Sequence, residues 1–499
     1  MKLQQVIAGT DIGGAGEAIL DLNATGVSCD TRSMSAGELF FAVAPEFAAE
    51  AWSKGALAVV LDQNAPCPPS LPAENCLRSA DIRLAMALAA ANFFGRPAHR
   101  LTMLGVTGTN GKTTVSLLVE SMLRAAGESV GVVGTIGYRY AGQSFDAPNT
   151  TPGSIRLQRL LADMRAQGVT SAVMEVSSHA LDQARAAGVP FTSAAFTNLT
   201  RDHLDYHGDM ERYFAAKRRL FTELCAGVCA INVDDPHGQR LHAELLREGR
   251  VTFGFSAGGQ EADLFVSDLR VDLDGIGGTL HTPRGHARFH SRLVGRHNVE
   301  NILAAAGLVL GAGFELPEVI AGIESLDLVP GRLERVPSPA SAVFVDYAHT
   351  DDALSHVLGS LRELTRGRLI CVFGCGGDRD HGKRPLMGEA VGRGADMAIV
   401  TNDNPRSESP EDIAAAICEG LERVGRRQVS AEEIGASTGA FHIELDRRRA
   451  IAIALGVARA DDVVLIAGKG HETYQLIGGH RFDFDDRAEA LRILAGGGR

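Results

Sequence analysis

The stretch Gly105-Val-Thr-Gly-Thr-Asn-Gly-Lys-Thr-Thr114 decides the fold of this chain. It overlaps an apolar run at residues 101–106 and leads into a second apolar stretch, so it predicts a strand, a tight loop and a helix. The N–H groups of such a loop face an anion, Lys112 adds a positive charge and Thr113 can ligate Mg²⁺. The stretch therefore predicts a site for the phosphates of ATP. A plain connecting turn is the alternative, because five residues separate Gly105 from Gly111 and the general P-loop spacing allows four.

Strands and helices alternate on both sides of this loop, which is typical of parallel α/β sheets. A chain of 499 residues exceeds what one hydrophobic core normally supports. We expect three domains: residues 1–99, residues 100–332 with the P-loop, and residues 333–499 with a doubly wound, Rossmann-like sheet. The expected strands include residues 39–43, 56–61, 171–176, 194–197, 369–373, 397–401 and 463–467, and the expected helices include residues 83–94 and 155–167. The predicted fold class is therefore α/β.

Composition narrows the classes of partner. The formal net charge is −12, from 49 Lys and Arg against 61 Asp and Glu. This balance argues against a broad nucleic-acid surface, so a bound nucleotide would depend on locally placed cations. The eight cysteines are scattered without the spacing of a zinc site, and no apolar stretch approaches the ~18 residues that would span a bilayer. We expect a cytoplasmic protein, a monomer, that neither binds nucleic acid nor inserts into a membrane.

Polar side chains follow the expected central strands at the place where open α/β sheets bind ligands. Glu175 ends an apolar strand, and a buried carboxylate there needs a cation, which Mg²⁺ would supply. An ion-paired buried glutamate is the alternative. His203 and His207 follow the next strand four residues apart, but Gly208 and the residues between them argue against a regular zinc-binding helix. We expect His203 alone to lie near Mg²⁺, and solvated loop histidines are the alternative.

Lys217 lies on an apolar helical stripe. Met210, Phe214 and Phe221 recur at helical spacing within residues 209–224, and Lys217 lies among them. Burial would lower the pKa of the lysine amine and make it a nucleophile, including toward CO₂. The alternative is an alkyl stem packed flat, with the ammonium reaching water. Helical geometry alone supports these two interpretations of Lys217 equally.

Two more polar groups lie near the expected junction of the second and third domains. His297 and Asn301 are one helical turn apart at the start of an apolar helix, where they could hold a base or a ribose. Asp346 and His349 follow an expected strand at residues 342–345. Helix capping and turn chemistry are the alternative for both groups.

Several motifs resemble those of the Mur ligase family in order and spacing, over nearly the whole chain. They are Gly108-Thr-Asn-Gly-Lys-Thr-Thr114, Glu175-Val-Ser-Ser-His179, Asn198-Leu-Thr-Arg-Asp-His-Leu-Asp-Tyr-His207, Gly295-Arg-His-Asn-Val-Glu-Asn301 and Asp346-Tyr-Ala-His-Thr350. The members that add diaminopimelate are the most similar, through Asn149-Thr-Thr-Pro152, Gly376-Gly-Asp-Arg-Asp380, Asp403-Asn-Pro-Arg406 and Gly468-Lys-Gly-His-Glu472. The resemblance implies a ligase of peptidoglycan-precursor synthesis whose first domain binds a UDP-linked substrate, whose second binds ATP and whose third binds an amino acid.

The resemblance also implies a mechanism. ATP would phosphorylate the D-Glu side-chain carboxylate of UDP-N-acetylmuramoyl-L-Ala-D-Glu, and the amine of meso-2,6-diaminopimelate would then displace phosphate from the acyl phosphate. Lys112 and two Mg²⁺ ions suit the charge that builds on the transferring phosphoryl oxygens. By resemblance Thr113, Glu175 and His203 hold metal, and Lys217 is carbamylated, which makes it a carboxylate-like metal ligand.

Binding residues for each substrate follow from the resemblance. ATP would contact Gly108, Thr109, Asn110, Gly111, Lys112, Thr113, Thr114, His297, Asn301, Arg332, Asp346 and His349. The UDP-linked dipeptide would contact Cys29, Thr31, Asn149, Thr150, Thr151, Ser177, Gln183 and Arg185. Diaminopimelate would contact Arg379, Asp403, Asn404, Pro405, Arg406, Gly468 and Glu472. In the first domain, the Gly/Asp-rich loop that is usual in the family is replaced by a shorter segment, residues 45–50. The resemblance therefore does not indicate which residues of this chain would contact the uracil.

Arg406 is expected to select the amino acid. Diaminopimelate has a second carboxylate that lysine lacks; Arg406 can take this carboxylate bidentately while Glu472 meets the accompanying ammonium. Lysine would leave the guanidinium unpaired, so we expect discrimination of roughly 10⁴ or more. The alternatives are a lysine-adding ligase, a folylpolyglutamate synthase-like ligase, and a protein that binds a partner when ATP orders its surface. An arginine in a surface turn is the alternative for Arg406 itself.

Overall fold

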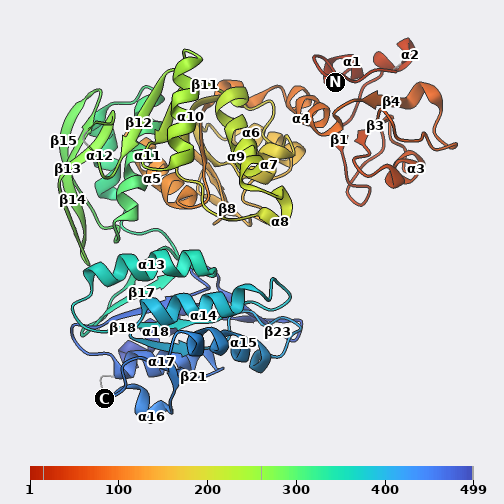
Figure 1. Ribbon diagram of the computed structural model, residues 1–499. Coiled ribbons are helices and arrows are strands. Elements are labelled where there is room, and N and C mark those ends of the chain that lie inside the picture. Colours follow the sequence, from red (N-terminus) through yellow and green to blue (C-terminus); the bar gives the residue numbers. More distant parts are fainter. Residues whose placement is uncertain (15, 260, 497–499) are drawn as a thin grey trace. The chain divides into compact units, whose positions relative to one another are not determined.

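The computed structural model describes residues 1–14, 16–259 and 261–496, and it confirms the α/β class (Figure 1). The chain forms two compact units. Unit 1 comprises Met1–Ser267, Thr279–Arg288 and Glu300–Ser325, and unit 2 comprises Asp268–Gly278, Phe289–Val299 and Leu326–Arg499. The division into three domains stays a prediction. Among the described residues, no helix has the length and apolar character needed to cross a bilayer.

The first hundred residues contain a four-stranded parallel sheet in the order β1-β2-β3-β4. Its strands are β1 Val27–Ser28, β2 Leu39–Phe41, β3 Ala58–Asp62 and β4 Cys76–Ser79. The helices of this region are α1 Leu3–Val6, α2 Glu17–Leu20, η1 Pro45–Phe47, α3 Ala48–Ser53, η2 Ala73–Asn75, α4 Ile82–Phe93 and η3 Pro97–Arg100. Asp81 caps α4, because its carboxylate accepts a 3.0 Å hydrogen bond from Leu84 N. The expected strands and helix here are thus confirmed, with ends displaced by one or two residues.

The second sheet has eleven strands in the order β15-β14-β13-β12-β11-β10-β5-β9-β6-β7-β8. They are β5 Thr102–Thr107, β6 Val130–Val133, β7 Tyr138–Tyr140, β8 Gln143–Phe145, β9 Ser171–Glu175, β10 Phe191–Phe196, β11 Cys225–Asn232, β12 Thr252–Ser256, β13 Leu264–Asp272, β14 Gly275–Thr282 and β15 Gly285–Ser291. The helices are α5 Lys112–Ala125, α6 Ser154–Ala166, α7 Ser178–Asp182, α8 Leu204–His207, α9 Met210–Arg219, η4 Leu220–Leu224, α10 Pro236–Arg247, α11 His297–Gly311 and α12 Leu316–Ser325. Strands β6, β9, β5, β10, β11 and β12 are parallel, so their carboxyl ends share one edge.

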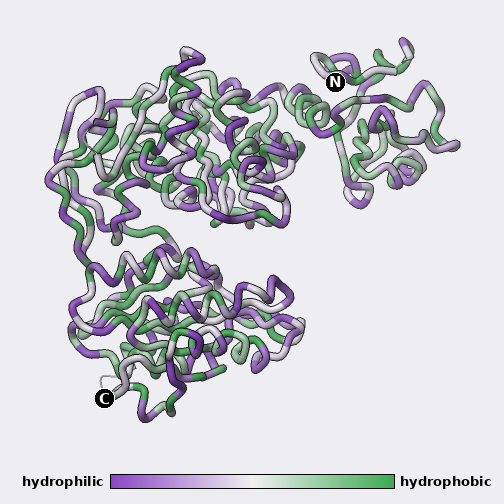
Figure 2. The backbone as a smooth tube through the Cα atoms, viewed as in Figure 1, coloured by the Kyte–Doolittle hydropathy of each residue, from purple (hydrophilic) through white to green (hydrophobic). Residues whose placement is uncertain are grey.

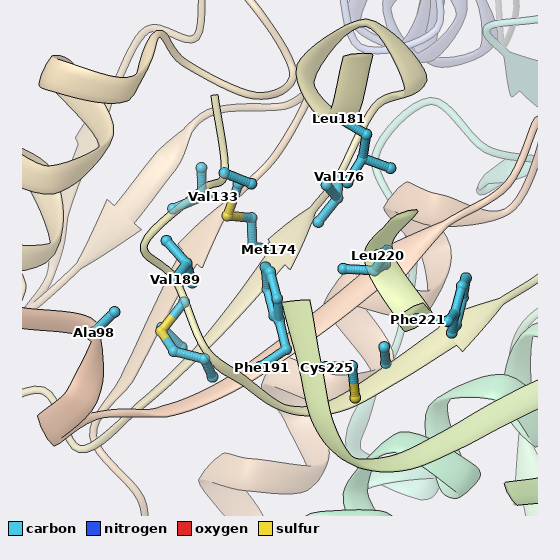
Figure 3. Packing of buried hydrophobic residues seen from close by; sticks show 14 of the residues in the cluster. Ala98, Val133, Met174, Val176, Leu181, Val189, Phe191, Leu220, Phe221 and Cys225 are labelled. Atoms are coloured by element: carbon cyan, nitrogen blue, oxygen red, sulfur yellow. The ribbon is translucent and has the colours of Figure 1, made fainter. Parts of the chain in front are cut away.

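Alternate residues of these strands face opposite sides of the sheet. Met103 and Met174 join a buried cluster with side chains of α6, α9 and α10, whereas Leu104 does not belong to it. Figure 3 shows Met174, Val189 and Phe191 of this cluster close together. Helix α5 instead packs against α12. The parallel part of the sheet is therefore covered on both faces, as its apolar strands require.

The helical pattern predicted over residues 209–224 is corrected in its second half. Helix α9 ends at Arg219, and Leu220–Leu224 form a π-helical turn. This wider turn accompanies the burial of two consecutive side chains, Leu220 and Phe221. Lys217 remains inside α9, on its buried side.

The third sheet has seven strands in the order β16-β17-β22-β18-β19-β21-β20, of which only β16 is antiparallel to its neighbour within the described residues. The strands are β16 Glu334–Val336, β17 Ala342–Asp346, β18 Leu369–Phe373, β19 Met397–Val400, β20 Arg427–Gln428, β21 Ala440–Ile443 and β22 Val463–Ala467, and β23 Tyr474–Ile477 pairs with β24 His480–Asp483 in a separate hairpin. The helices are α13 Asp351–Leu364, α14 Lys383–Gly394, α15 Pro410–Arg423, α16 Ala431–Ile434, α17 Arg447–Val457 and α18 Asp486–Gly496.

This third sheet is doubly wound. Cys371 and Leu465 lie in one buried cluster with side chains of α13, α14 and α15, whereas Val372 and Ile466 lie in a second cluster with side chains of α17 and α18. In Figure 2, hydrophobic segments run through this region at the place where Figure 1 labels β17 and β18. Helices therefore cover both faces, which confirms the predicted Rossmann-like arrangement.

Candidate active site

The loop after β5 folds around its own lysine. Lys112 Nζ donates hydrogen bonds to the carbonyls of Gly108, at 2.8 Å, and Thr109, at 2.9 Å. Gly111 has φ 87°, a left-handed conformation that glycine adopts without strain, and α5 begins at the next residue. A Cβ at Gly108 would collide with the Thr197 hydroxyl. The predicted strand, loop and helix are thus confirmed, and the loop leads directly into the N-terminus of a fourteen-residue helix.

The segment that follows β10 holds the P-loop in place. Asn198 Oδ1 accepts a 2.9 Å hydrogen bond from Asn110 N, and Thr197 Oγ1 donates a 2.6 Å bond to Asn110 O. Asn301 of α11 lies against Gly111, since a Cβ at this glycine would meet the Asn301 amide oxygen. The predicted residues Asn110, Gly111 and Asn301 are therefore brought together within unit 1.

Glu175 is a buried carboxylate at the end of β9, with 1% of the residue exposed. Its Oε2 accepts hydrogen bonds from the hydroxyls of Thr113, at 3.1 Å, and Thr135, at 2.9 Å, and its Oε1 accepts from Thr135 N at 2.9 Å. Within the part of the chain that the structure describes, Glu175 has no ion pair, so the ion-paired alternative is wrong. Thr135 was not predicted; its position just after β6, at the shared carboxyl edge, was the available signal.

The two spaced histidines have different surroundings. His203 adopts φ 53° before the single turn of α8, and its ring centroid lies 4.9 Å from that of His179. His207 is buried, and its Nε2 lies 3.0 Å from Ser178 Oγ. No group of three or more His, Cys, Asp or Glu side chains able to hold a metal occurs among the described residues. A zinc site built on both histidines therefore finds no support, and His203 as a metal ligand stays a prediction.

Lys217 is fully buried, with 1% of the residue exposed. Its Nζ donates a 2.7 Å hydrogen bond to the carbonyl of Gly108 and lies 4.6 Å from the ring centroid of Tyr213. Burial, reinforced by the positive charge of Lys112, holds the pKa of the Lys217 amine well below its usual value. The alternative of a flat stem with an ammonium in water is wrong. Tyr213, which also lies 3.2 Å from the Thr109 hydroxyl, was missed as a neighbour of both groups.

Six residues predicted for the UDP-linked dipeptide form one connected group beside Glu175. The contacts are Thr150 Oγ1 to Thr135 Oγ1 at 3.0 Å, Thr151 Oγ1 to Glu175 O at 2.8 Å, Ser177 N to Thr151 Oγ1 at 3.0 Å, Arg185 Nη1 to Thr151 O at 3.1 Å, Arg185 Nη2 to Gln183 Oε1 at 2.6 Å and Tyr138 OH to Asn149 O at 2.6 Å. Cys29 is exposed and Thr31 is buried after β1, and no hydrogen bond in the described residues joins either to this group. The short residues 45–50 form η1 and the start of α3.

The other residues predicted for ATP lie in unit 2. Asp346 ends β17, and its carboxylate accepts hydrogen bonds from Leu333 N at 2.7 Å and Ala348 N at 2.8 Å. The other three are partly buried: the Arg332 guanidinium lies 5.0 Å from the Tyr347 ring centroid, His349 Nδ1 lies 2.8 Å from Tyr347 O, and His297 Nδ1 lies 3.2 Å from Ser360 Oγ. The Asp346 carboxylate is thus engaged in ordering its own loop, and a role for these four residues toward ATP stays a prediction.

The predicted amino-acid residues lie at the carboxyl edge of the third sheet. Asp403, Asn404 and Pro405 are buried after β19. Arg406 has φ 55° and donates a 2.6 Å hydrogen bond from Nη1 to Gly377 O. Its N–H donates to Leu476 O of β23 and its carbonyl accepts from Gly478 N, so it is held rather than free in a turn. Glu472 Oε2 accepts a 2.9 Å hydrogen bond from Asn404 Nδ2.

Two further predicted residues lie at this edge. Gly468 follows β22 at φ 116°, and Arg379 is exposed on the loop after β18. At this φ a residue with a side chain would be strained, so the position favours glycine. Lys469, inside the quoted motif, was not assigned a role from the sequence.

Comparison with known proteins agrees with this geometry. Residues 106–309 match the Mur ligase middle domain, and residues 331–470 match the domain described as "Mur ligase, glutamate ligase domain". The UDP-N-acetylmuramoyl-L-alanyl-D-glutamate–2,6-diaminopimelate ligase of Geobacter metallireducens is 45% identical over 100% of this chain and 99% of its own. A solved structure of a ligase with the same name is 34% identical, with a TM-score of 0.72 over 100% of this chain and 99% of that one.

A more distant structure shares the fold alone. The folylpolyglutamate synthase of Mycobacterium tuberculosis, solved in complex with ADP, is 20% identical with a TM-score of 0.62 over 84% of this chain and 95% of its own. The two family matches together cover more than half of the chain, and the similarity to the diaminopimelate ligases spans its full length. The chain belongs to the Mur ligase family.

Proposed function

We propose that this chain is an ATP-dependent amide ligase that joins meso-2,6-diaminopimelate to the D-Glu side-chain carboxylate of UDP-N-acetylmuramoyl-L-Ala-D-Glu and forms ADP and phosphate. The observation that carries the proposal is the full-length similarity to ligases named for this reaction, at 45% identity over 100% of the chain. The reaction belongs to peptidoglycan-precursor synthesis, and we propose that it takes place in the cytoplasm on a monomeric enzyme. A lysine-adding or folylpolyglutamate synthase-like activity has less support, since the latter shares only the fold at 20% identity.

In the proposed reaction the P-loop holds the phosphates of ATP. The N-terminus of α5 and the Lys112 ammonium supply positive charge where the transferring phosphoryl group becomes more negative. A D-Glu carboxylate oxygen bonds to the γ-phosphorus as the bond to ADP breaks. The neutral amine of the amino acid then attacks the acyl carbon, loses a proton, and phosphate leaves with the former carboxylate oxygen.

The surroundings of Glu175 fit Mg²⁺. Its carboxylate is buried, with 1% of the residue exposed, and forms no ion pair in the described residues. The hydroxyls of Thr113 and Thr135 flank it, so the group offers the hard oxygen ligands that Mg²⁺ prefers. Bound Mg²⁺ would neutralise charge on the phosphate oxygens. Thr113, Glu175 and His203 are the residues that we propose to hold it.

Lys217 fits the proposed carbamate. Burial and the neighbouring Lys112 disfavour its ammonium form, and a neutral amine can add to CO₂. In that step nitrogen bonds to carbon and one proton is released, so the group changes from a potential cation to an anion. A carbamate would place a carboxylate-like oxygen pair near the carbonyl of Gly108, within the P-loop, where a second Mg²⁺ could be held.

The test is a reconstituted reaction. Purified protein with ATP, Mg²⁺, the UDP-linked dipeptide and diaminopimelate should release phosphate and form the UDP-linked tripeptide. Omission of either the dipeptide or the amino acid should abolish the release. Phosphate release that is indifferent to both acceptors would contradict the ligase and favour a nucleotide-switched binding protein. Equal use of lysine would contradict the amino-acid assignment.

A further inference from the structure

A lysine with no assigned role lies at the centre of the proposed amino-acid site. Lys469 has a side chain with 0% exposure. Its Nζ donates a 2.7 Å hydrogen bond to Tyr474 O and a 3.1 Å bond to Asn404 Oδ1, and it lies 3.2 Å from Asp403 Oδ1. An ammonium has three N–H donors. Two of these donors are taken by Tyr474 O and Asn404 Oδ1, and the ammonium also forms ion pairs with Asp403 Oδ1 and, at 3.8 Å, with Glu472 Oε2.

The Asn404 side-chain amide can take only one orientation here. Its Oδ1 accepts from both Lys469 Nζ and Leu476 N, at 3.1 and 3.0 Å, so its Nδ2 must be the atom that faces Glu472. The resulting hydrogen bond from Asn404 Nδ2 to Glu472 Oε2 is 2.9 Å long. The reversed amide would place Nδ2 against the Lys469 ammonium and the Leu476 N–H, where it has nothing to donate to.

This arrangement joins three separate segments of unit 2. Asn404 follows β19, Lys469 and Glu472 follow β22, and Leu476 lies in β23. Main-chain bonds complete the connection, because Arg406 N donates to Leu476 O and Gly478 N donates to Arg406 O, at 2.9 and 2.8 Å. Arg406 and Glu472, proposed to meet the two ends of the distal zwitterion, are thereby positioned through the same hairpin.

We infer that Lys469 is a positioning residue: it sets the orientation of Asn404, which in turn holds the Glu472 carboxylate ready for the distal ammonium of the amino acid. The inference rests on the proposed function for the identity of that ligand. Lys469 also compensates the buried Asp403 carboxylate, which a neutral replacement would leave without this partner. Removal of the ammonium takes away one of the two donors to Asn404 Oδ1 and the 3.8 Å ion pair with Glu472, so the Asn404 amide and the Glu472 carboxylate are both held less firmly.

The experiment compares Lys469→Met, which keeps the length of the side chain and removes its charge, with the wild-type enzyme. The KM for diaminopimelate should rise by roughly 10- to 100-fold, the effect of losing a charge-assisted hydrogen bond in a binding site. The KM values for ATP and for the UDP-linked dipeptide should stay within about twofold, because both substrates are proposed to bind elsewhere. Unchanged KM for diaminopimelate in a folded Lys469→Met variant would overturn the inference.

Arg368→Met is the matched control. Arg368 is another mostly buried cation of the same sheet, paired with Asp462 at 2.6 Å, but it precedes β18 at the opposite, amino edge. Its removal should lower the melting temperature without a selective change in the KM for diaminopimelate. An equal selective change in this control would show that any loss of a buried cation disturbs the site, and would overturn the specific role of Lys469.

A second variant covers the case in which Lys469→Met does not fold. Lys469→Gln keeps an N–H donor for Asn404 Oδ1 but lacks the positive charge, so it should raise the KM for diaminopimelate above that of the wild type, and an unchanged KM would overturn the inference. In the wild type, the Asn404 side-chain amide protons should exchange slowly with solvent, and fast exchange would contradict the proposed orientation. Failure of the wild type itself to use diaminopimelate would instead refute the proposed function.

Discussion

Lys112 and Lys217 donate hydrogen bonds to the same carbonyl oxygen, that of Gly108, at 2.8 and 2.7 Å. Two ammonium ions on one acceptor repel each other, and Lys217 is the fully buried member of the pair. The neutral form of Lys217 is therefore favoured. This gives a physical reason for a lysine on the apolar stripe of α9 to react with CO₂, whereas the sequence pattern alone allowed an inert stem equally well.

The first prediction concerns this amine. In bicarbonate labelled with ¹³C, the wild type should show one carbamate carbon resonance, and Lys217→Met should lack it. Turnover of Lys217→Met should fall by roughly 10²-fold or more, the typical cost of losing a preorganised electrostatic group. A Lys217→Met variant with full turnover would remove the carbamate from the mechanism. Arg218→Met, one position further along α9 at a partly exposed ion pair with Glu244, is the control and should retain turnover.

Selection of the amino acid is the subject of the second prediction. Arg406→Asn removes the guanidinium, and asparagine tolerates the φ of 55° at this position better than most residues. The ratio of kcat/KM for diaminopimelate over lysine, expected at roughly 10⁴ or more in the wild type, should fall by at least about 10²-fold. Steady-state kinetics with both amino acids measures it. A ratio that does not change would show that another group reads the second carboxylate.

The third prediction is about stability. Arg447 and Asp486 form an ion pair in which both side chains have 0% exposure, and the Arg447 Nη2 atom also donates to Ala467 O at 2.9 Å. Arg447→Met should lower the free energy of unfolding by roughly 3–5 kcal/mol, because Asp486 is left buried without its partner. The double variant Arg447→Met/Asp486→Leu should recover part of this loss. Urea unfolding measures both, and additive losses in the double variant would contradict the coupling.

The fourth prediction is a pH dependence. Burial, with the nearby positive charge of Arg332, lowers the pKa of His297 and of His471 to about 4, whereas the unfolded chain binds a proton on each near pH 6.5. The unfolded state therefore takes up more protons between these values, and stability falls as the pH is lowered from about 6.5 to about 4. His297→Asn, which can keep a bond to Ser360, should flatten this part of the curve. Urea midpoints that fall equally steeply in this variant would contradict the prediction.

Strands made of uninterrupted apolar residues were predicted most accurately. Leu369–Phe373 and Val463–Ala467 lie where expected to the residue, since both faces of a doubly wound sheet require apolar side chains and turn residues flank each run. The strand expected at residues 194–197 begins earlier, at Phe191, where an exposed Thr192 and a register shift against β11 interrupt the pattern. Local composition therefore predicts the presence of a strand more accurately than it predicts the residues at which the strand begins and ends.

Most residues of the candidate site could be recognised from their own motifs in the sequence. The contacts that these residues make with one another could not. Glu175 and Thr113 were each recognised from their own motifs, but their 3.1 Å hydrogen bond joins residues 62 positions apart. Thr135 carries no distinctive motif, yet it contributes two of the hydrogen bonds to Glu175. The direction of the Asn404 amide depends on Leu476 of β23, whose pairing no local pattern specifies.

The most direct test of the central claim follows an oxygen atom. The D-Glu side-chain carboxylate of the UDP-linked dipeptide is labelled with ¹⁸O, the complete reaction is run with ATP and diaminopimelate, and the released phosphate is analysed by mass spectrometry. Activation as an acyl phosphate transfers one labelled oxygen to each phosphate formed, because the bond that breaks on amine attack joins the acyl carbon to that oxygen. Unlabelled phosphate alongside ligated product would contradict the account.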